Sequence, residues 1–410
     1  MSRRVVVTGM GAVTPVGNDV ASFWDGLISG KNGIDFITKF DATDYKVKIA
    51  AEVKDFHPAD FIEKSMLRKT DLFCQYAMAA AAQAMDDSKI AGKVEPERLG
   101  VYVGSGIGGM NTFVEECTKL QNIGPRRVSP FFIPKLISNI AAGNIAVAQN
   151  AKGPSICIVT ACSTSTNAIG EAYRAIQNGY ADAIITGGSE APITGLAVAG
   201  FTNCMALCTS NDPKNASMPF DKRRSGFVMG EGGAILILED YEHAVSRGAN
   251  IYGEICGYGN TNDAYHMTAP QPEGEGITSA IRLAVKEAGV PSDAKLYINA
   301  HGTSTELNDK TETIAFKKAF GEQAHTALIS STKSMTGHML GATGAAEAIA
   351  CVLALKNGIV PPTIGYKEPD PECDLDYVPN KARKAELDYA ISTNLGFGGH
   401  NACLVFRRAK

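Results

Sequence analysis

The sequence predicts a layered α/β fold, in which strands and helices alternate along the chain. Short β-branched runs recur through the 410 residues, and segments with helical periodicity lie between them. The chain also contains 42 glycines, which suits the tight turns and close backbone approaches of a layered fold. Such alternation favours mostly parallel strand pairing, with helices covering the faces of the sheet.

The predicted strands are short apolar runs. Arg4 to Gly9 is predicted to be buried, because three consecutive valines precede Thr8 and Gly9. The other predicted strands are Gly100–Gly104, Ile156–Thr160, Ala183–Gly188, Ile235–Leu238, Leu296–Ala300, Leu328–Ser330 and Cys403–Phe406.

The predicted helices lie between these runs. From Leu72 to Met85, apolar residues recur at i, i+3 and i+4, which indicates a helix with one apolar face. The same pattern predicts helices over about 164–176, 277–288, 311–320 and 345–355.

No low-complexity linker divides the chain, but a seam is predicted near Glu239–Gly253, where a charged helix ends and a new strand begins. The two sides resemble each other weakly. Val5–Gly11 and Gly253–Gly259 are both short strands that run into Gly-x-Gly. This similarity hints at an internal duplication.

Composition and charge exclude several classes of protein. The net charge of −4 gives no basic excess for nucleic acid, and no basic amphipathic helix points to a membrane surface. The ten cysteines are scattered without paired CxxC spacing, which argues against zinc and suits a reducing cytoplasm. The N-terminal residues Met1–Val7 contain too short an apolar run for a secretion signal, and no run is long enough to span a membrane.

Cys162 is the candidate nucleophile. It follows the apolar run that ends at Thr160 and precedes small polar residues that lead into a helix. A thiol at a helix N-terminus is favoured as thiolate, and the free backbone N–H groups there can receive an oxyanion. The alternative is a cysteine packed at a strand end.

His301 and His338 are candidate partners of this thiol. Each follows a predicted strand within a segment rich in Gly and Thr, where α/β proteins commonly place their chemistry. Lys333 precedes His338 and is flanked by small hydroxyl residues, while Glu347 lies on the following helix. The alternatives are a structurally held histidine and a solvated lysine.

Together these groups suit a decarboxylating condensation. A thiolate can take an acyl group from a thioester, and two neutral imidazoles can stabilise the enolate of a second thioester. The Gly-rich segment Leu395–Asn401 adds free backbone N–H groups and one aromatic residue, although such a segment is more often a simple hairpin turn. Gly9-x-Gly11 lacks the third glycine of a dinucleotide site, and no phosphate-binding Gly-Lys-Ser/Thr motif is present.

Four ordered motifs resemble the signatures of the type II 3-oxoacyl-acyl-carrier-protein synthases, within the thiolase superfamily. These motifs are Thr160–Ser163, Asn299–Thr305, Ser331–His338 and Gly396–Gly399, and the resemblance also includes Arg4–Gly9 and Pro219–Asp221. The resemblance implies a thiolase-like, five-layered αβαβα fold built from two pseudo-symmetric halves. Residues 1–250 would form the half that carries Cys162, and residues 251–410 the half that carries the two histidines.

The resemblance also implies the roles of individual residues. Cys162, His301 and His338 would be catalytic, with Lys333 supporting the histidines and Glu347 as its charge partner. Phe397 would gate the acyl pocket, and its backbone N–H would form the oxyanion hole with that of Cys162. The remaining implied residues are the supporting acids Asp309 and Glu312, the pantetheine contacts Thr303 and Thr305, and Ile107 in the acyl pocket.

The implied activity is elongation of an acyl chain by two carbons from malonyl carrier, with release of CO₂. The implied partners are the acidic acyl carrier protein and a second copy of the chain, with no resident cofactor or metal. Lys64, Arg68, Lys69, Arg126 and Arg127 are the candidate docking residues for the carrier. Leu395 and His400 depart from the residues common in the family.

The alternatives that remain are a type I synthase, a polyketide-type condensing enzyme, a thiolase acting on coenzyme A and a non-catalytic chain-length factor. A thiolase would normally carry a second catalytic cysteine in the C-terminal Gly-rich motif, and Gly398–Asn401 has none.

Overall fold

The computed structural model describes residues 3–409. Met1 and Ser2 lie outside the described residues. They belong to the N-terminal segment that was predicted to lack a secretion signal. The strands are β1 (Val5–Val13), β2 (Asp35–Phe36), β3 (Ile49–Ala50), β4 (Leu99–Gly104), β5 (Ser155–Ile156), β6 (Ala183–Glu190), β7 (Gly232–Asp240), β8 (Gly253–Asn262), β9 (Leu296–Asn299), β10 (Leu328–Ser330), β11 (Ile359–Val360), β12 (Arg383–Lys384), β13 (Tyr389–Gly396) and β14 (His400–Arg407).

The helices lie between these strands and include short single turns. They are α1 (Val20–Ser29), α2 (Lys64–Leu67), α3 (Leu72–Ser88), α4 (Met110–Ile123), α5 (Phe132–Leu136), α6 (Ile140–Gln149), α7 (Thr164–Gln177), α8 (Gly195–Asn203), α9 (Tyr241–Ser246), α10 (Glu275–Ala288), α11 (Glu306–Phe320), α12 (Lys333–Thr336) and α13 (Thr343–Asn357).

Ten strands form one sheet in the order β10-β9-β13-β14-β8-β1-β7-β6-β4-β5. The prediction of mostly parallel pairing is wrong. Only the β10–β9, β13–β9, β4–β5 and β4–β6 pairs are parallel, and the five pairs towards the middle of the sheet are antiparallel. Hairpins such as β13–β14 bring consecutive strands side by side, which strand–helix alternation alone does not reveal.

The sheet consists of two five-stranded groups with the same topology. Numbered in chain order within each group, both β5-β4-β6-β7-β1 and β10-β9-β13-β14-β8 have the order 3-2-4-5-1. The groups meet where β1 pairs with β8. That the boundary between the two halves lies between residues 250 and 251 stays a prediction.

The two Gly-x-Gly segments seen in the sequence occupy equivalent places. A Cβ on Gly11 would lie 2.0 Å from the carbonyl oxygen of Ala80 in α3, and one on Gly259 would lie 1.9 Å from that of Ala280 in α10. Only glycine allows a helix to approach its strand this closely. The repeated motif therefore has the same packing function in both halves.

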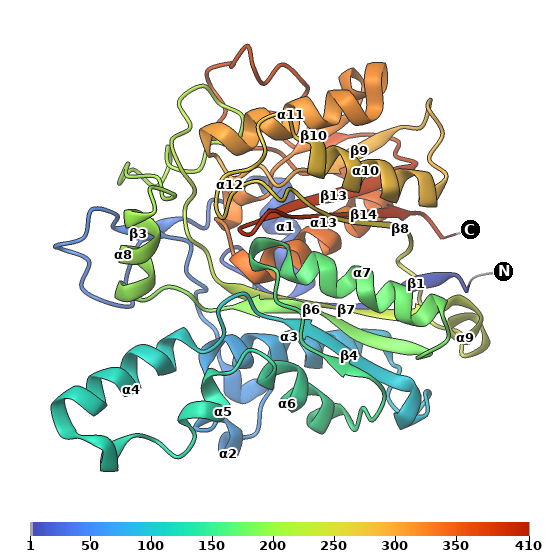
Figure 1. Cartoon of the computed structure of the whole chain (residues 1–410). Helices are drawn as coiled ribbons and strands as arrows, with labels where there is room; N and C mark the ends of the chain where they lie inside the picture. Colours follow the sequence, from blue (N-terminus) through green and yellow to red (C-terminus); the bar gives the residue numbers. More distant parts are fainter. Residues whose placement is uncertain (1–2, 410) are drawn as a thin grey trace.

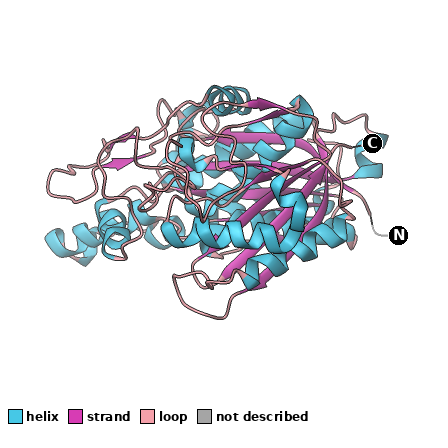
Figure 2. Ribbon diagram, turned by 90° about the horizontal axis from the view of Figure 1, so that it is seen from above, coloured by secondary structure: helices cyan, strands magenta, loops and turns pink. Residues whose placement is uncertain are grey.

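The helices and strands lie in five layers (Figure 1). α3 covers β1 and β7 on one outer face, and α10 covers β8 and β14 on the other. Between the two groups of strands lie α7 and α13, which contact each other: α7 packs on β6, and α13 packs on β13 and β7. Figure 2, seen from above, shows the strands enclosed by helices. The fold is thus the thiolase-like arrangement that the resemblance implied.

Most predicted elements are confirmed, with boundaries shifted by a few residues. The exception is Ile156–Thr160, where β5 ends at Ile156 and the following residues approach Cys162 without regular structure. Helices α1, α2, α4, α5, α6, α8 and α12 and the short strands β2, β3, β11 and β12 were not predicted. Among the described residues, no helix combines the length and apolar character needed to cross a membrane.

Candidate active site

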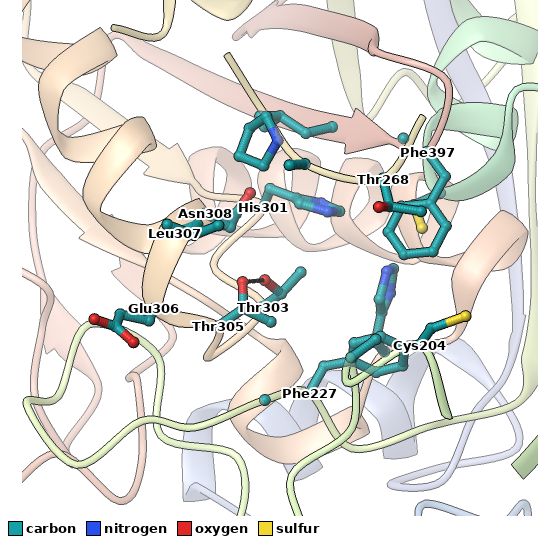
Figure 3. A pocket seen from close by; sticks show the side chains of 18 of the residues that line it. Cys204, Phe227, Thr268, His301, Thr303, Thr305, Glu306, Leu307, Asn308 and Phe397 are labelled. Carbon is teal, nitrogen blue, oxygen red and sulfur yellow. Dashed lines mark hydrogen bonds between the residues drawn. The ribbon is translucent and has the colours of Figure 1, made fainter. Parts of the chain in front are cut away.

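One cavity brings together six of the predicted site residues. Its volume is about 360 Å³. Figure 3 shows His301, Phe397 and Phe227 around it, with Thr303 and Thr305 on one side. The predicted residues that line it are Cys162, Thr303, Thr305, His301, His338 and Phe397. Residues far apart in the sequence therefore share one solvent-connected site.

Cys162 lies where the chain enters α7. It is the middle residue of the 3₁₀ turn Ala161–Ser163, which continues directly into the helix. Ala161 has a φ of +51°, a left-handed conformation that a residue with a Cβ rarely adopts. The turn directs the thiol into the cavity at the helix N-terminus, in the place that the sequence predicted.

The resting state of Cys162 differs from the prediction. Burial raises the pKa of this thiol to about 12, although the Lys333 charge and the backbone N–H groups of Phe397 and Cys162 lower it. The expectation that the helix start would favour thiolate in the free protein is therefore wrong. Desolvation of the charged sulfur outweighs the Lys333 charge and the two backbone N–H groups.

The two histidines face each other in the cavity. Their ring centroids are 5.2 Å apart, and the ring planes make an angle of 86°. Burial lowers the pKa of each imidazole well below its usual value, and the nearby Lys333 charge lowers it further. Both rings are therefore neutral near neutral pH, as the proposed enolate chemistry requires.

Each histidine has a polar contact at Nδ1. The Nδ1 of His338 lies 3.1 Å from Oγ1 of Thr343, and the Nδ1 of His301 lies 3.5 Å from Nδ2 of Asn394. A hydrogen-bond donor at Nδ1 leaves the ring proton on Nε2. When the Thr343 hydroxyl donates to Nδ1 of His338, the ring proton is on Nε2, from which it can donate to a substrate oxygen.

Glu312 holds the loop that carries His301. Its carboxylate accepts hydrogen bonds of 2.7 Å from the backbone N–H groups of both His301 and Gly302. Burial raises the pKa of Glu312 to about 7, and burial likewise raises that of Asp309 to about 6. Asp309 accepts from the N–H of Phe220 at 2.8 Å. Both acids thus contact the loops behind the cavity.

Lys333 and Glu347 form a buried ion pair. Nζ and Oε1 are 2.5 Å apart, and each side chain is 1% exposed. The second carboxylate oxygen of Glu347 accepts from Asn394 at 2.6 Å, and Asn394 in turn accepts from Thr166 of α7 at 2.5 Å. This chain of contacts connects α7, the helix that follows Cys162, to Lys333.

Phe397 belongs to the turn of the β13–β14 hairpin. From the sequence, the Gly-rich segment could either supply free backbone N–H groups or form a simple hairpin turn. Gly398 and Gly399 both have left-handed φ angles, of +91° and +79°. The N–H of Gly398 donates to the carbonyl of Met267, and the Phe397 ring lies 6.4 Å from that of Phe201. The hairpin thus presents Phe397 to the cavity.

Ile107 does not line the open cavity. It packs with Phe201 and Met110 against the buried apolar cluster that contains Cys162, Phe227 and Leu340. Thr303 and Thr305 do line the cavity, and their hydroxyls are 2.9 Å apart (Figure 3). The two threonines therefore face the cavity, whereas Ile107 packs in the apolar cluster that contains Cys162.

The five basic docking candidates lie outside the cavity and are exposed. Lys64 is in α2, Arg68 and Lys69 follow it, and Arg126 and Arg127 lie in the turn after α4. Lys69 is 5.9 Å from the ring of Phe131, which follows that turn. The two groups of basic residues are therefore connected through neighbouring segments.

Sequence reasoning missed Asn394, Thr343 and Glu190, which contact the site without lining the cavity. A polar residue at a buried strand end next to a glycine motif, such as Asn394, is the signal that could have identified one of them. Within residues 3–409, no group of three or more His, Cys, Asp or Glu side chains is arranged to hold a metal ion.

Two family models match the sequence. The N-terminal domain of beta-ketoacyl synthase matches residues 2–244, and the C-terminal domain matches residues 252–367. The chain is 52% identical over 408 residues to 3-oxoacyl-[acyl-carrier-protein] synthase 2 of Staphylococcus aureus (strain COL), covering 99% of both chains. The enzyme of the same name from Synechocystis sp. is also 52% identical over 408 residues, covering 99% of this chain and 98% of the relative.

Solved structures of ketosynthases also resemble this chain. The ishigamide ketosynthase/chain length factor superposes with a TM-score of 0.94 at 35% identity, covering 100% of each chain. A type II polyketide ketosynthase, solved in complex with its acyl-carrier protein and bound to a hexaketide, superposes with a TM-score of 0.92 at 35% identity, again covering 100% of each chain.

Proposed function

The chain belongs to the beta-ketoacyl synthase family, and we propose that it elongates acyl chains through Cys162, His301 and His338. It is an acyl-transferring condensing enzyme of fatty acid synthesis. The observation that supports the residue roles is the shared cavity, in which one thiol and two neutral imidazoles line a space of about 360 Å³.

The first step transfers the acyl group to Cys162. The sulfur attacks the thioester carbonyl of the acyl carrier, the carbon–sulfur bond to the carrier breaks, and the carrier thiol leaves with the proton. Because burial raises the pKa of Cys162 to about 12, this proton must move as the sulfur attacks. The backbone N–H groups of Cys162 and Phe397 would receive the oxyanion.

The second step uses the histidines. They hold the thioester oxygen of malonyl carrier while its carboxylate leaves as CO₂, so that the electron pair becomes an enolate. The enolate carbon attacks the acyl carbonyl on Cys162, the bond to sulfur breaks, and 3-oxoacyl carrier is released. The freed thiolate then takes one proton. No resident cofactor enters this scheme, because the carrier brings its own phosphopantetheine arm.

Replacement of Cys162 by alanine tests the scheme. Cys162→Ala should lose the acyl-enzyme adduct and the condensation while still releasing CO₂ from malonyl carrier, because the histidines remain. Mass spectrometry of peptides from the acylated wild-type protein locates the adduct. An adduct on Cys204, the other cysteine that lines the cavity, or condensation by Cys162→Ala at the wild-type rate, would contradict the proposal.

The proposed partner is an acidic acyl carrier protein that docks on Lys64, Arg68, Lys69, Arg126 and Arg127. None of these side chains forms an ion pair with a described acid, so their charges are available to a partner. The solved relative in complex with its carrier supports this partner class. Charge reversal at Arg126 and Arg127 should raise KM for carrier substrates, and an unchanged KM at low salt would remove them from the interface.

A homodimer is proposed from the exposed edge of the sheet. β5 is the last strand, and its Ile156 is 47% exposed. Val159 and Val147 nearby in sequence are 52% and 82% exposed. An open, apolar edge strand is a site for pairing with another chain. Sedimentation should give a dimer for the wild type and a monomer for Ile156→Asp, and a wild-type monomer would refute the proposal.

A cytoplasmic location is proposed from the cysteines. All ten are free, including the exposed Cys204, which suits a reducing compartment.

A non-catalytic chain-length factor is the second candidate function, because one solved relative is a ketosynthase with such a subunit. Acyl transfer by the isolated protein, without an added subunit, separates the two functions.

A further inference from the structure

Glu190 is a buried carboxylate that no step of the proposed mechanism uses. It is the last residue of β6 and is 0% exposed. Its Oε1 accepts hydrogen bonds from Ser105 Oγ at 2.7 Å and from the backbone N–H of Ile107 at 3.1 Å. Its Oε2 accepts from the N–H groups of Gly106 at 2.8 Å and Gly341 at 3.0 Å. Four donors therefore satisfy this carboxylate.

These donors come from two segments that flank Cys162. Gly106 and Ile107 lie in the loop after β4, and Gly341 lies in the turn that follows His338. The two segments are in close contact. A Cβ added to Gly341 would lie 2.6 Å from both Oε2 of Glu190 and the backbone nitrogen of Gly106, so a larger residue would not fit there. Ser105 extends the connection by accepting from the N–H of Gly108 at 3.0 Å. The carboxylate is thus the contact that joins the loop to the turn.

Both segments supply apolar walls beside the nucleophile. Ile107 from the loop and Leu340 from the turn belong to the cluster that contains Cys162. Leu340 has a left-handed φ of +46°, so the turn holds a conformation that its own residue disfavours. A conformation of this kind persists when the surrounding contacts fix it, and Glu190 supplies one of these contacts at the next residue.

We propose that Glu190 is a positioning residue that fixes the Ile107 loop against the His338 turn and thereby sets the acyl-chain preference of the pocket beside Cys162. This inference rests on the proposed function, since it requires the acyl chain to enter the apolar cluster around Cys162. If Glu190 releases the loop, the walls formed by Ile107 and Leu340 move relative to the thiol. Long chains, which must pass these walls, are then affected differently from short ones.

Glu190→Gln is the direct test. Glutamine keeps the size of the side chain and one acceptor oxygen, but its NH₂ group cannot accept from the two donors that it faces. We expect the ratio of kcat/KM for long and short acyl carriers, measured as acyl transfer to Cys162, to change on the order of tenfold. A purely structural role would lower both values together and leave the ratio unchanged.

Glu254→Gln is the matched control. Glu254 is 3% exposed and is paired with Arg4 and Arg407 at the opposite end of the strands from Glu190, so this variant should keep the wild-type ratio. Ser105→Ala removes one donor to Glu190 with less risk to folding and should shift the ratio in the same direction. This milder variant decides the question if Glu190→Gln does not fold.

A double-mutant cycle with Ile107→Ala tests whether Glu190 acts through the loop. Coupling predicts that Glu190→Gln changes the ratio less in the Ile107→Ala background than in the wild type. Unchanged ratios in folded Glu190→Gln and Ser105→Ala would overturn the inference, as would additive effects in the cycle. Failure of the wild-type protein to acylate Cys162 with any chain would instead overturn the proposed function.

Discussion

The buried ion pair between Lys333 and Glu347 can be tested by removing one of its two charges and measuring the change in stability. Both side chains are 1% exposed, with 2.5 Å between Nζ and Oε1. Lys333→Met removes the positive charge and keeps an unbranched side chain of similar length. The Glu347 carboxylate then stays buried, with the side-chain amide of Asn394 still donating to it.

The expected cost is large, because a buried charge loses its partner. Breaking a buried pair from one side destabilises a protein by about 3–5 kcal/mol. For 410 residues, an unfolding entropy of about 2.1 cal/mol/K per residue gives about 0.9 kcal/mol/K, so the unfolding midpoint should fall by about 3–6 °C. The double variant Lys333→Met with Glu347→Gln removes both charges and should recover much of this loss.

The loss should also depend on pH. Burial raises the pKa of Glu347, while Lys333 and Asn394 lower it, so that removing Lys333 raises this pKa further. A carboxyl whose folded pKa exceeds its unfolded value binds more protons when folded, and stability therefore increases as pH falls towards the unfolded value. The deficit of Lys333→Met should be smaller at about pH 6 than at about pH 8.

Thermal unfolding of Lys333→Met and of the double variant, at both pH values, measures these effects. Lys89→Met is the control, because Lys89 pairs with Asp86 at the surface, where the side chains are 73% and 83% exposed. This variant should change stability by less than about 1 kcal/mol. Wild-type stability of Lys333→Met at about pH 8, or a deficit that grows on acidification, would refute the reasoning.

The remaining predictions concern the thiol, the histidine pair and the helix–strand contacts. Because the pKa of Cys162 is about 12, its alkylation by iodoacetamide should accelerate about tenfold per pH unit between about pH 7 and pH 9, and a plateau in this range would contradict the burial argument. His338→Ala should lower CO₂ release from malonyl carrier about 10²–10³-fold while Cys162 still becomes acylated, which single-turnover assays can separate. Gly259→Ala should destabilise the fold because its Cβ would lie 1.9 Å from the Ala280 carbonyl oxygen, whereas Gly200→Ala in α8, with no atom within 4 Å, should stabilise it by about 0.5–1 kcal/mol; equal unfolding midpoints would contradict both expectations.

Local sequence patterns predicted the helices and strands that are buried and periodic. α3 and β1 are examples, since a regular apolar face specifies both the element and the side that it buries. Ile156–Thr160 was predicted as one strand because its composition is apolar and β-branched. The structure ends β5 at Ile156, since the following residues must turn towards Cys162.

The site was predictable to the extent that its residues lie in short, ordered motifs. Cys162 and His338 each follow a short run that leads into a Gly- or Thr-rich segment. Glu190 carries no such local pattern, because its role depends on donors that are distant in the sequence. It accepts from residues 85 positions before it and 151 positions after it.

The sequence by itself determined the buried, periodic helices and strands, the Gly-x-Gly repeat and the identity of the thiol and imidazole groups. These follow from local periodicity, turn chemistry and motif spacing, which do not require knowledge of distant contacts. Only the tertiary structure decided the antiparallel centre of the sheet and the protonation state of Cys162. Strand pairing depends on which segments meet, and the thiol stays protonated because surrounding layers remove water from it, which no local pattern records.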